Sequence, residues 1–458
     1  MTSQIAAAVL VAGGVAVRVL AARGDMWIDE IWSIGMAHES PGVVALLTAM
    51  PSDNNHHLNT LFQLLVGPNA PSLVHRSLAI AAGLGTLLLT ASSPLAGDRP
   101  QRLVALFLMA VSPFAVQYTS EARGYGPALF LALACACLWD AYRRRPRVVT
   151  GALFTFSAAL GLLSHLTVAF PLAAVAAWAL LDLPRRVGWR RAAATLAGLF
   201  ALPAATLAFL YVFHLRPMVL GGGDGTPFFE ALRQAVDAML GIPRGPLEIL
   251  SVAALGAGAA ELLRMARSDR GRAAFFAIAL LAEPAWILVS RPEMVYARYF
   301  VVSTPFFLIL LAGALRRLGA SRPWGRGASA GILAVIAAAS TLHLATLLRD
   351  GRGHFREVLA WMYDHGRGDV ITVGSDHDIP TFTVLRYYAR ESGRTERVVL
   401  LPREQWTSVY PEWIVREGGP EPESFIARNG KRYERVRSFT ASPNAGLDWR
   451  LYRISDGS

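Results

Sequence analysis

The stretch IAAAVLVAGGVAVRVLAARGDMWIDEIW, residues 5–32, joins an apolar run to two adjacent carboxylates held between tryptophans. The apolar part, Ile5 to about Leu20, lacks a basic leader and a convincing small-residue cleavage site, so we expect an uncleaved membrane helix. Tryptophan favours the membrane interface, and a carboxylate within reach of hydrocarbon is costly and usually has a function. This placement makes Asp29 the leading candidate for a catalytic base at the membrane surface.

Composition predicts a membrane environment for most of the chain. Of 458 residues, 53% are hydrophobic and 17% are charged, and the mean hydropathy is +0.38, which is typical of a polytopic membrane protein. The formal net charge is +11, but the arginines form short clusters between apolar runs, so they indicate topology and no nucleic-acid partner. Cys135 and Cys137 share one apolar run, which favours small buried side chains over a zinc site.

Apolar runs and arginine clusters together predict the topology. After the first run, further runs lie near 72–96, 103–118, 127–141, 148–165, 166–182, 192–213, 246–263, 273–290, 299–315 and 327–348. Since about 20 apolar residues cross a bilayer, we expect about eleven transmembrane helices. Arginines cluster at 98–102, 143–147, 185–191, 264–272 and 316–326. With the N-terminus inside, every second loop carries these arginines, as the positive-inside rule requires, and Asp29 then lies on the outer side.

Two outer segments have their own predicted structure. Residues 21–71 are too long for a simple turn, and an amphipathic stretch within them favours short helices lying in the interface over another span. From about residue 350 the sequence becomes mixed and charged, with helices expected at 355–365 and 381–390 and strands at 369–374, 398–401 and 449–454. We therefore expect an all-α polytopic membrane module, residues 1–349, followed by a small extracytoplasmic α/β domain, residues 350–458.

Polar groups capable of chemistry concentrate on the predicted outer side. They are Asp25, Asp29, Glu30, Asp53, Asn54, His56, His57, Glu121, Arg123, Tyr125, His165, Arg291, Glu293, Arg298 and Tyr299. Carboxylates can transfer protons, and guanidinium groups can hold a phosphate. A sugar on a lipid phosphate already carries a good leaving group, so an aspartate and arginines would suffice for its transfer. No P-loop or GxGxxG motif is visible, and such a donor would need neither.

Four short motifs occur in an order that resembles a known family. They are Trp27-Ile28-Asp29-Glu30, Asn55-His56-His57-Leu58, Arg76-Ser77-Leu78-Ala79 and Ser120-Glu121-Ala122-Arg123-Gly124-Tyr125. Over about the first 170 residues the chain resembles GT-C glycosyltransferases, in the branch of protein O-mannosyltransferases and lipid A aminoarabinose transferases. Two motifs depart from the family pattern: His56-His57-Leu58-Asn59 replaces a common His-Pro-Pro-Leu, and Glu121-Ala122-Arg123 replaces Arg-x-x-Asp.

The resemblance implies a polyprenyl-phosphate sugar donor and an inverting transfer to an extracytoplasmic lipid, glycan or protein acceptor at a bacterial plasma membrane. It implies that Asp29 is the catalytic base, that Glu30 is its acidic neighbour and that Glu121 is a second catalytic carboxylate, which assists the acceptor or a metal. We expect Arg123 and Arg298 to bind the donor phosphate. We expect a further set to contact substrate or a divalent metal: His56, His57, Asp53, His165 and Tyr125.

Other interpretations of the same residues stay open. Asp29 and Glu30 could cap a helix, Glu121 and Arg123 could form a salt bridge at a helix end, and the histidines could make interfacial hydrogen bonds. The whole chain could instead be a lipid-linked sugar flippase or transporter, which should place ionisable groups near the middle of the membrane. It could also be a non-catalytic relative that binds a partner through its outer domain.

Overall fold

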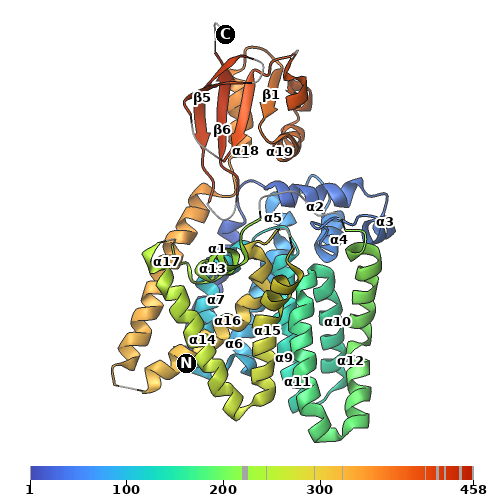
Figure 1. The fold of residues 1–458 in the computed structure, drawn as a ribbon, viewed down its shortest axis with the longest axis vertical. Helices are drawn as coiled ribbons and strands as arrows, with labels where there is room; N and C mark the ends of the chain where they lie inside the picture. The colour runs from blue at the N-terminus through green and yellow to red at the C-terminus, as the bar shows by residue number, and fades with distance from the viewer. Residues whose placement is uncertain are drawn as a thin grey trace.

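The computed structural model describes residues 2–218, 225–243, 245–292, 294–321, 323–407, 409–418, 422–427, 430–442 and 446–455. A bundle of long helices forms its lower part in Figure 1, and a sheet domain stands above it. The long helices are α1 (Thr2–Ala21), α6 (Ser77–Ser92), α7 (Arg99–Val111), α9 (Tyr125–Arg144), α10 (Val148–Ser164), α11 (Ala169–Val187), α12 (Trp189–Leu210), α14 (Ile249–Ser268), α15 (Arg270–Ser290), α16 (Thr304–Ser321) and α17 (Gly325–Asp350).

The bundle has the character of a multi-pass membrane protein. Within the described residues, 8 helices are long and apolar enough to cross a bilayer, and α6 and α10 are shorter apolar helices. The remaining expected span, 103–118, is divided between α7 and the short α8 (Pro113–Tyr118), because Ser112 caps a new helix that starts at a proline. The predicted all-α polytopic fold with a small C-terminal sheet domain is confirmed.

The arginine-rich turns gather at one end of the bundle, away from the sheet domain (Figure 1). Nη2 of Arg143 lies 3.9 Å from Oδ2 of Asp269, and Nη2 of Arg316 lies 3.6 Å from Oδ2 of Asp98. Each acid also caps a helix, since Asp98 accepts from the Gln101 amide and Asp269 from the Arg272 amide, both at 2.9 Å. The clusters that indicated topology in the sequence are therefore neighbours in space.

Short helices cover the other end of the bundle. They are α2 (Ile28–Glu39), α3 (Val43–Thr48), α4 (His57–Val66), α5 (Ser72–His75) and α13 (Phe228–Leu240). Figure 1 shows α2 lying across the bundle, beneath the sheet domain. Residues 21–71 thus form short helices in place of another span, as their length and polarity predicted.

The C-terminal domain is a six-stranded mixed sheet in the order β2-β1-β3-β6-β5-β4, with two helices. The elements are α18 (Phe355–His365), β1 (Ile371–Ser375), α19 (Asp378–Glu391), β2 (Val398–Leu400), β3 (Trp413–Glu417), β4 (Ser424–Ile426), β5 (Arg432–Phe439) and β6 (Trp449–Ile454). β1 runs parallel to β2 and β3, and the other pairings are antiparallel. The sequence interpretation found β1, β2 and β6 but missed β3, β4 and β5.

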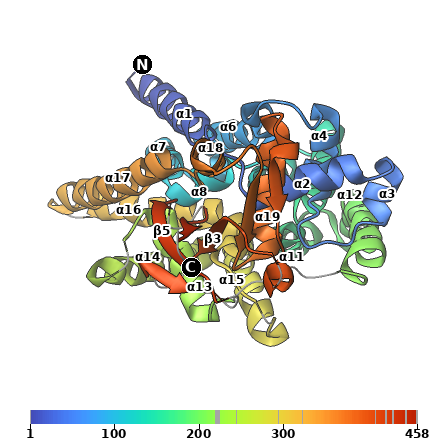
Figure 2. The same cartoon turned by 90° about the horizontal axis from the view of Figure 1, so that it is seen from above.

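This domain shares its hydrophobic core with α2. Met26, Ile28, Ile31 and Ile34 belong to the same buried cluster as side chains of α18, α19 and the central strands. In Figures 1 and 2, α19 lies beside α2, which agrees with their contacts. Because burial of such side chains contributes about 1.5–3 kcal/mol each, the shared core fixes α2 between the bundle and the domain.

Candidate active site

Asp29 lies in the first turn of α2, facing two arginines from distant segments. Its Oδ2 atom is 2.7 Å from Nη1 of Arg123 and 4.0 Å from Nη1 of Arg298. The Asp29 side chain is 13% exposed, so it is partly shielded but still reachable. Arg123 comes from the turn before α9, and Arg298 from η5 (Ala297–Ser303), before α16. Three segments therefore converge on one carboxylate; the predicted roles of these residues stay predictions.

Asn54, to which the sequence interpretation gave no role, connects the backbone of Asp29 to the side chain of Arg123. Asn54 donates to the Asp29 carbonyl at 2.9 Å, and its Oδ1 accepts from Nη2 of Arg123 at 2.8 Å. The Arg123 guanidinium also lies 4.8 Å from the ring centroid of Tyr125. Burial alone would lower the pKa of Arg123, but Asp29 and Tyr125 raise it, so the guanidinium stays charged.

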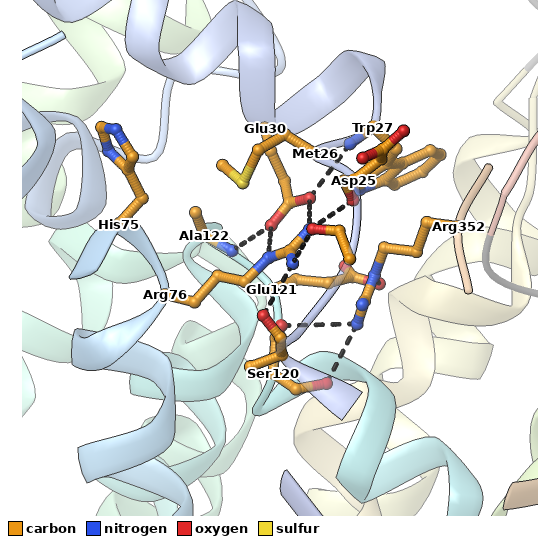
Figure 3. A network of polar contacts seen from close by, with 12 residues as sticks. Asp25, Met26, Trp27, Glu30, His75, Arg76, Ser120, Glu121, Ala122 and Arg352 are labelled. Atoms are coloured by element: carbon orange, nitrogen blue, oxygen red, sulfur yellow. Dashed lines mark hydrogen bonds and ion pairs between the residues drawn. The ribbon is translucent and has the colours of Figure 1, made fainter. Parts of the chain in front are cut away.

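Glu30, beside Asp29 in sequence, points away into a buried ion pair (Figure 3). Arg76 binds it with both arms of the guanidinium, at 2.7 Å and 2.6 Å, and both side chains are 0% exposed. Glu30 also accepts from the amides of Ala122 at 2.7 Å and Trp27 at 3.1 Å. Burial would raise the pKa of Glu30, but Arg76 lowers it below its usual value. Its catalytic role stays a prediction; the contacts favour a structural one.

Glu121 is also fully buried, and its neighbour is a residue from the other end of the chain. Nε of Arg352 lies 3.4 Å from its Oε1, and its Oε2 has no hydrogen-bond partner among the described residues. Burial raises the pKa of Glu121, and Arg352 opposes that shift. The alternative in which Glu121 pairs with Arg123 is wrong as a direct contact, because Arg123 turns to Asp29. A catalytic role for Glu121 stays a prediction.

The residues expected to contact substrate or metal do not form one cluster. The rings of His56, Tyr125 and His165 are mutual neighbours. The ring centroids are 5.3 Å apart for His56 and Tyr125, 5.0 Å for His56 and His165, and 4.7 Å for Tyr125 and His165. His57 turns instead to His214 of the π-helix after α12, at 4.7 Å, and Asp53 is exposed. Within the described part of the chain, no three His, Cys, Asp or Glu side chains are placed to hold a metal ion. Glu293 lies outside the described residues.

These histidines should make the protein less stable in acid. Burial, together with the positive charges of Arg123 and Arg298, lowers the pKa of His165 to about 3. The unfolded chain binds that proton near pH 6.5, so the stability His165 contributes is complete above pH 6.5 and is lost as the pH falls toward 3. We expect the melting temperature of detergent-solubilised protein to fall between pH 7.5 and pH 5, and to fall less in His165→Asn. Asparagine can still accept the hydrogen bond from the Thr167 amide, so the substitution removes only the titrating ring. Equal falls in the melting temperature of both proteins would refute the role of His165 in the acid sensitivity.

A cavity of about 1020 Å³ lies between α2, the 49–54 segment and α19. Its lining includes Trp32, Asp53, Asn54, Arg386 and Tyr387. Asn54 belongs both to this wall and to the contacts of Asp29 and Arg123. A polar molecule in the cavity could thus contact Asn54, which hydrogen-bonds both the Asp29 carbonyl and the Arg123 guanidinium.

The sequence interpretation placed Asn54 in this region without a role, and it missed the roles of Arg76 and Arg352. Arg76 stood in a quoted motif without a role, and its position at the start of a span was a usable signal, because a charge there needs a partner. Arg352 offered a weaker signal, an arginine between two glycines after the last span.

No protein-family model and no curated protein matches this sequence. Its fold does match solved structures. ArnT from Cupriavidus metallidurans in the apo state matches with a TM-score of 0.58 at 12% identity, over 99% of this chain and 98% of that chain. ArnT bound to undecaprenyl phosphate matches with a TM-score of 0.54 at 13% identity, over 97% of each chain. Arabinofuranosyltransferase AftD from Mycobacteria gives 0.49 at 16% identity, over 99% of this chain and 42% of that chain.

Proposed function

We propose that this chain, which has the fold of the GT-C glycosyltransferases, transfers a sugar from a polyprenyl-phosphate donor to an acceptor hydroxyl. The observation that carries the proposal is the convergence of Arg123 and Arg298 on the Asp29 carboxylate, with Asn54 joining Arg123 to the wall of a cavity. A carboxylate can accept the acceptor's proton, and guanidinium groups can stabilise the departing phosphate. One of the similar ArnT structures holds undecaprenyl phosphate, which supports a donor of that class.

Single displacement with inversion fits this set of groups. The acceptor oxygen forms a bond to the anomeric carbon, the bond from that carbon to the phosphate oxygen breaks, and the acceptor proton passes to Asp29. The polyprenyl phosphate leaves with both electrons of the broken bond and needs no acid to protonate it. Glu30 and Glu121 are fully buried and face arginines, so neither is exposed as a second nucleophile.

Donor binding should free the base. In the structure, Nη1 of Arg123 lies 2.7 Å from Oδ2 of Asp29. A phosphate between Arg123 and Arg298 would compete for the same guanidinium and leave the carboxylate available for the acceptor proton. The acceptor would then approach from the cavity beside Asn54, and the lipid chain from the bilayer.

The proposal also includes an orientation. The gathered arginine turns would face the cytoplasm, and the Asp29 group and C-terminal domain the outer side. Both substrates would then meet on the outer side of the membrane. The lipid phosphate is the leaving group there, so the reaction needs no nucleotide-activated sugar.

Purified protein tests the reaction directly. We expect it to release free polyprenyl phosphate from a polyprenyl-phosphate sugar in the presence of total envelope glycan and lipid extract, measured by mass spectrometry. In parallel, a deletion strain should lose one sugar modification from its envelope, which the intact gene restores. Donor binding without release of polyprenyl phosphate, together with an unchanged glycan profile, would contradict transfer and favour a carrier or binding protein.

A further inference from the structure

Arg352 lies in the four-residue segment between α17 and α18, which joins the last span to the sheet domain, yet its side chain is buried. It follows α17 and stands between Gly351 and Gly353, whose φ angles of 59° and 154° suit glycine. The residue is 2% exposed. An arginine in a short connecting segment would ordinarily extend into water, because burying its charge costs several kcal/mol unless hydrogen bonds compensate.

Five contacts compensate that burial, and they all fall on two places in the bundle. Arg352 donates to the Ala21 carbonyl at the end of α1, at 2.7 Å. Its other contacts reach the end of α8 and the turn that follows it. They are the Gln117 carbonyl at 3.3 Å, the Ser120 hydroxyl at 2.9 Å, the Ser120 carbonyl at 3.4 Å and Glu121 at 3.4 Å. Figure 3 shows the guanidinium directed at Ser120 and Glu121.

The same turn carries Arg123 to Asp29. The Ala122 amide donates to Glu30, and the Arg123 amide donates to the Glu121 carbonyl at 2.8 Å. Arg352 therefore holds the beginning of the turn, Glu30 holds its middle, and Arg123 extends from its end. Arg352 does not contact Asp29, so any effect on transfer must pass through the turn.

The sheet domain in turn holds Arg352. The Gly351 carbonyl accepts from the Ser442 amide at 3.0 Å, and the Arg352 carbonyl accepts from the Leu447 amide at 3.2 Å. A Cβ atom on Gly446 would lie 2.0 Å from the Arg352 carbonyl oxygen, so the loop before β6 fits closely against this segment.

We propose that Arg352 is a positioning residue through which the C-terminal domain holds Arg123 in its working place. The proposal rests on the proposed function for its effect on transfer. The structural claim, that Arg352 holds residues 117–124 in place, does not depend on the proposed function. The phosphate gains negative charge as it leaves the sugar, and Arg298 still binds it when Arg123 is displaced. The loss should therefore appear in kcat more than in KM.

The test compares Arg352→Gln with Arg356→Gln. Arg356 also joins the sheet domain to the bundle, through Asp25, but its side chain is 44% exposed and it does not contact the turn. We expect Arg352→Gln to lower kcat about 100-fold, as misplacement by about 1 Å can, with KM for the donor within about twofold. Arg356→Gln should stay within about threefold of the wild type. Arg352→Lys should recover part of the loss, since lysine donates but lacks the planar fork.

Two further measurements keep the proposal testable if Arg352→Gln folds poorly. Gly446→Ala keeps the arginine but displaces its backbone, and it should reproduce the selective loss of kcat, whereas Gly368→Ala, with open space around it, should not. Hydrogen exchange in peptides spanning 117–124 should accelerate in Arg352→Gln and stay unchanged in Arg356→Gln. Wild-type kcat per folded molecule in Arg352→Gln would overturn the coupling to transfer, and unchanged exchange would overturn the positioning. Because exchange needs no turnover, failure of the proposed function is recognised separately.

Discussion

Asp29→Asn should lower the rate of sugar transfer by about 10²- to 10⁴-fold, the usual contribution of a general base. Asparagine keeps the size of the side chain and the backbone contacts of Asn54 and Ser33 with the residue 29 carbonyl, so folding should persist. It cannot accept the acceptor proton at neutral pH. Donor binding should be retained or strengthened, because Arg123 and Arg298 lose their competing carboxylate. The measurement is release of polyprenyl phosphate, with donor affinity measured by native mass spectrometry.

Asp364→Asn is the matched control for that experiment. It makes the same chemical change at an exposed carboxylate of α18, where no contact of the proposed site is altered. Its transfer rate should equal that of the wild type. If Asp29→Asn also turns over like the wild type, Asp29 is not the base, and a transport or binding function becomes the better account.

Arg76→Gln should destabilise the protein by about 3–5 kcal/mol, because it leaves a buried carboxylate without its counter-charge. The Arg76 guanidinium binds Glu30 twice and also donates to the carbonyls of Ala22, Gly24 and Asp25, at 2.9, 3.2 and 2.8 Å. Its loss would therefore loosen the connection from α1 to α2, on which Asp29 stands. Thermal unfolding in detergent, followed by tryptophan fluorescence, measures the effect.

Arg349→Gln is the control for this second prediction. Arg349 also pairs with a carboxylate, Asp350, but its side chain is 76% exposed, and such surface pairs contribute about 0–1 kcal/mol. Replacing both buried partners, as in Glu30→Leu with Arg76→Met, should recover much of the stability lost in Arg76→Gln. Similar melting temperatures for Arg76→Gln and Arg349→Gln would show that the buried Glu30–Arg76 pair does not stabilise the connection between α1 and α2.

The two predictions separate the roles of neighbouring acids. Asp29 and Glu30 are adjacent in sequence. The Asp29 side chain is 13% exposed and faces two arginines, whereas the Glu30 side chain is 0% exposed and forms a buried ion pair. Successive helix residues differ by about 100° in direction, so adjacent carboxylates on α2 cannot share one environment. The motif that the sequence presents as a catalytic pair thus becomes, in our proposal, one base and one structural anchor.

The membrane architecture could be predicted because it depends on local patterns. Apolar runs of spanning length, arginine clusters in alternate loops and interfacial tryptophans each fall within a short window of sequence. The same local patterns indicated the short helices of 21–71 and three of the six strands. β5, by contrast, has the sequence RYERVRSF, in which charged residues dilute the apolar alternation, and it was missed.

The sequence by itself determined the class of protein, the sidedness we propose for it and Asp29 as the first candidate for chemistry. Only the tertiary structure decided the partners of the charged groups. Glu30 and Arg76 are 46 residues apart, and Arg352 and Glu121 are 231 residues apart. Hydropathy and spacing report which groups avoid or seek water, but a buried charge takes its counter-charge from whichever segment packs against it. That choice depends on how the helices and the sheet domain pack together.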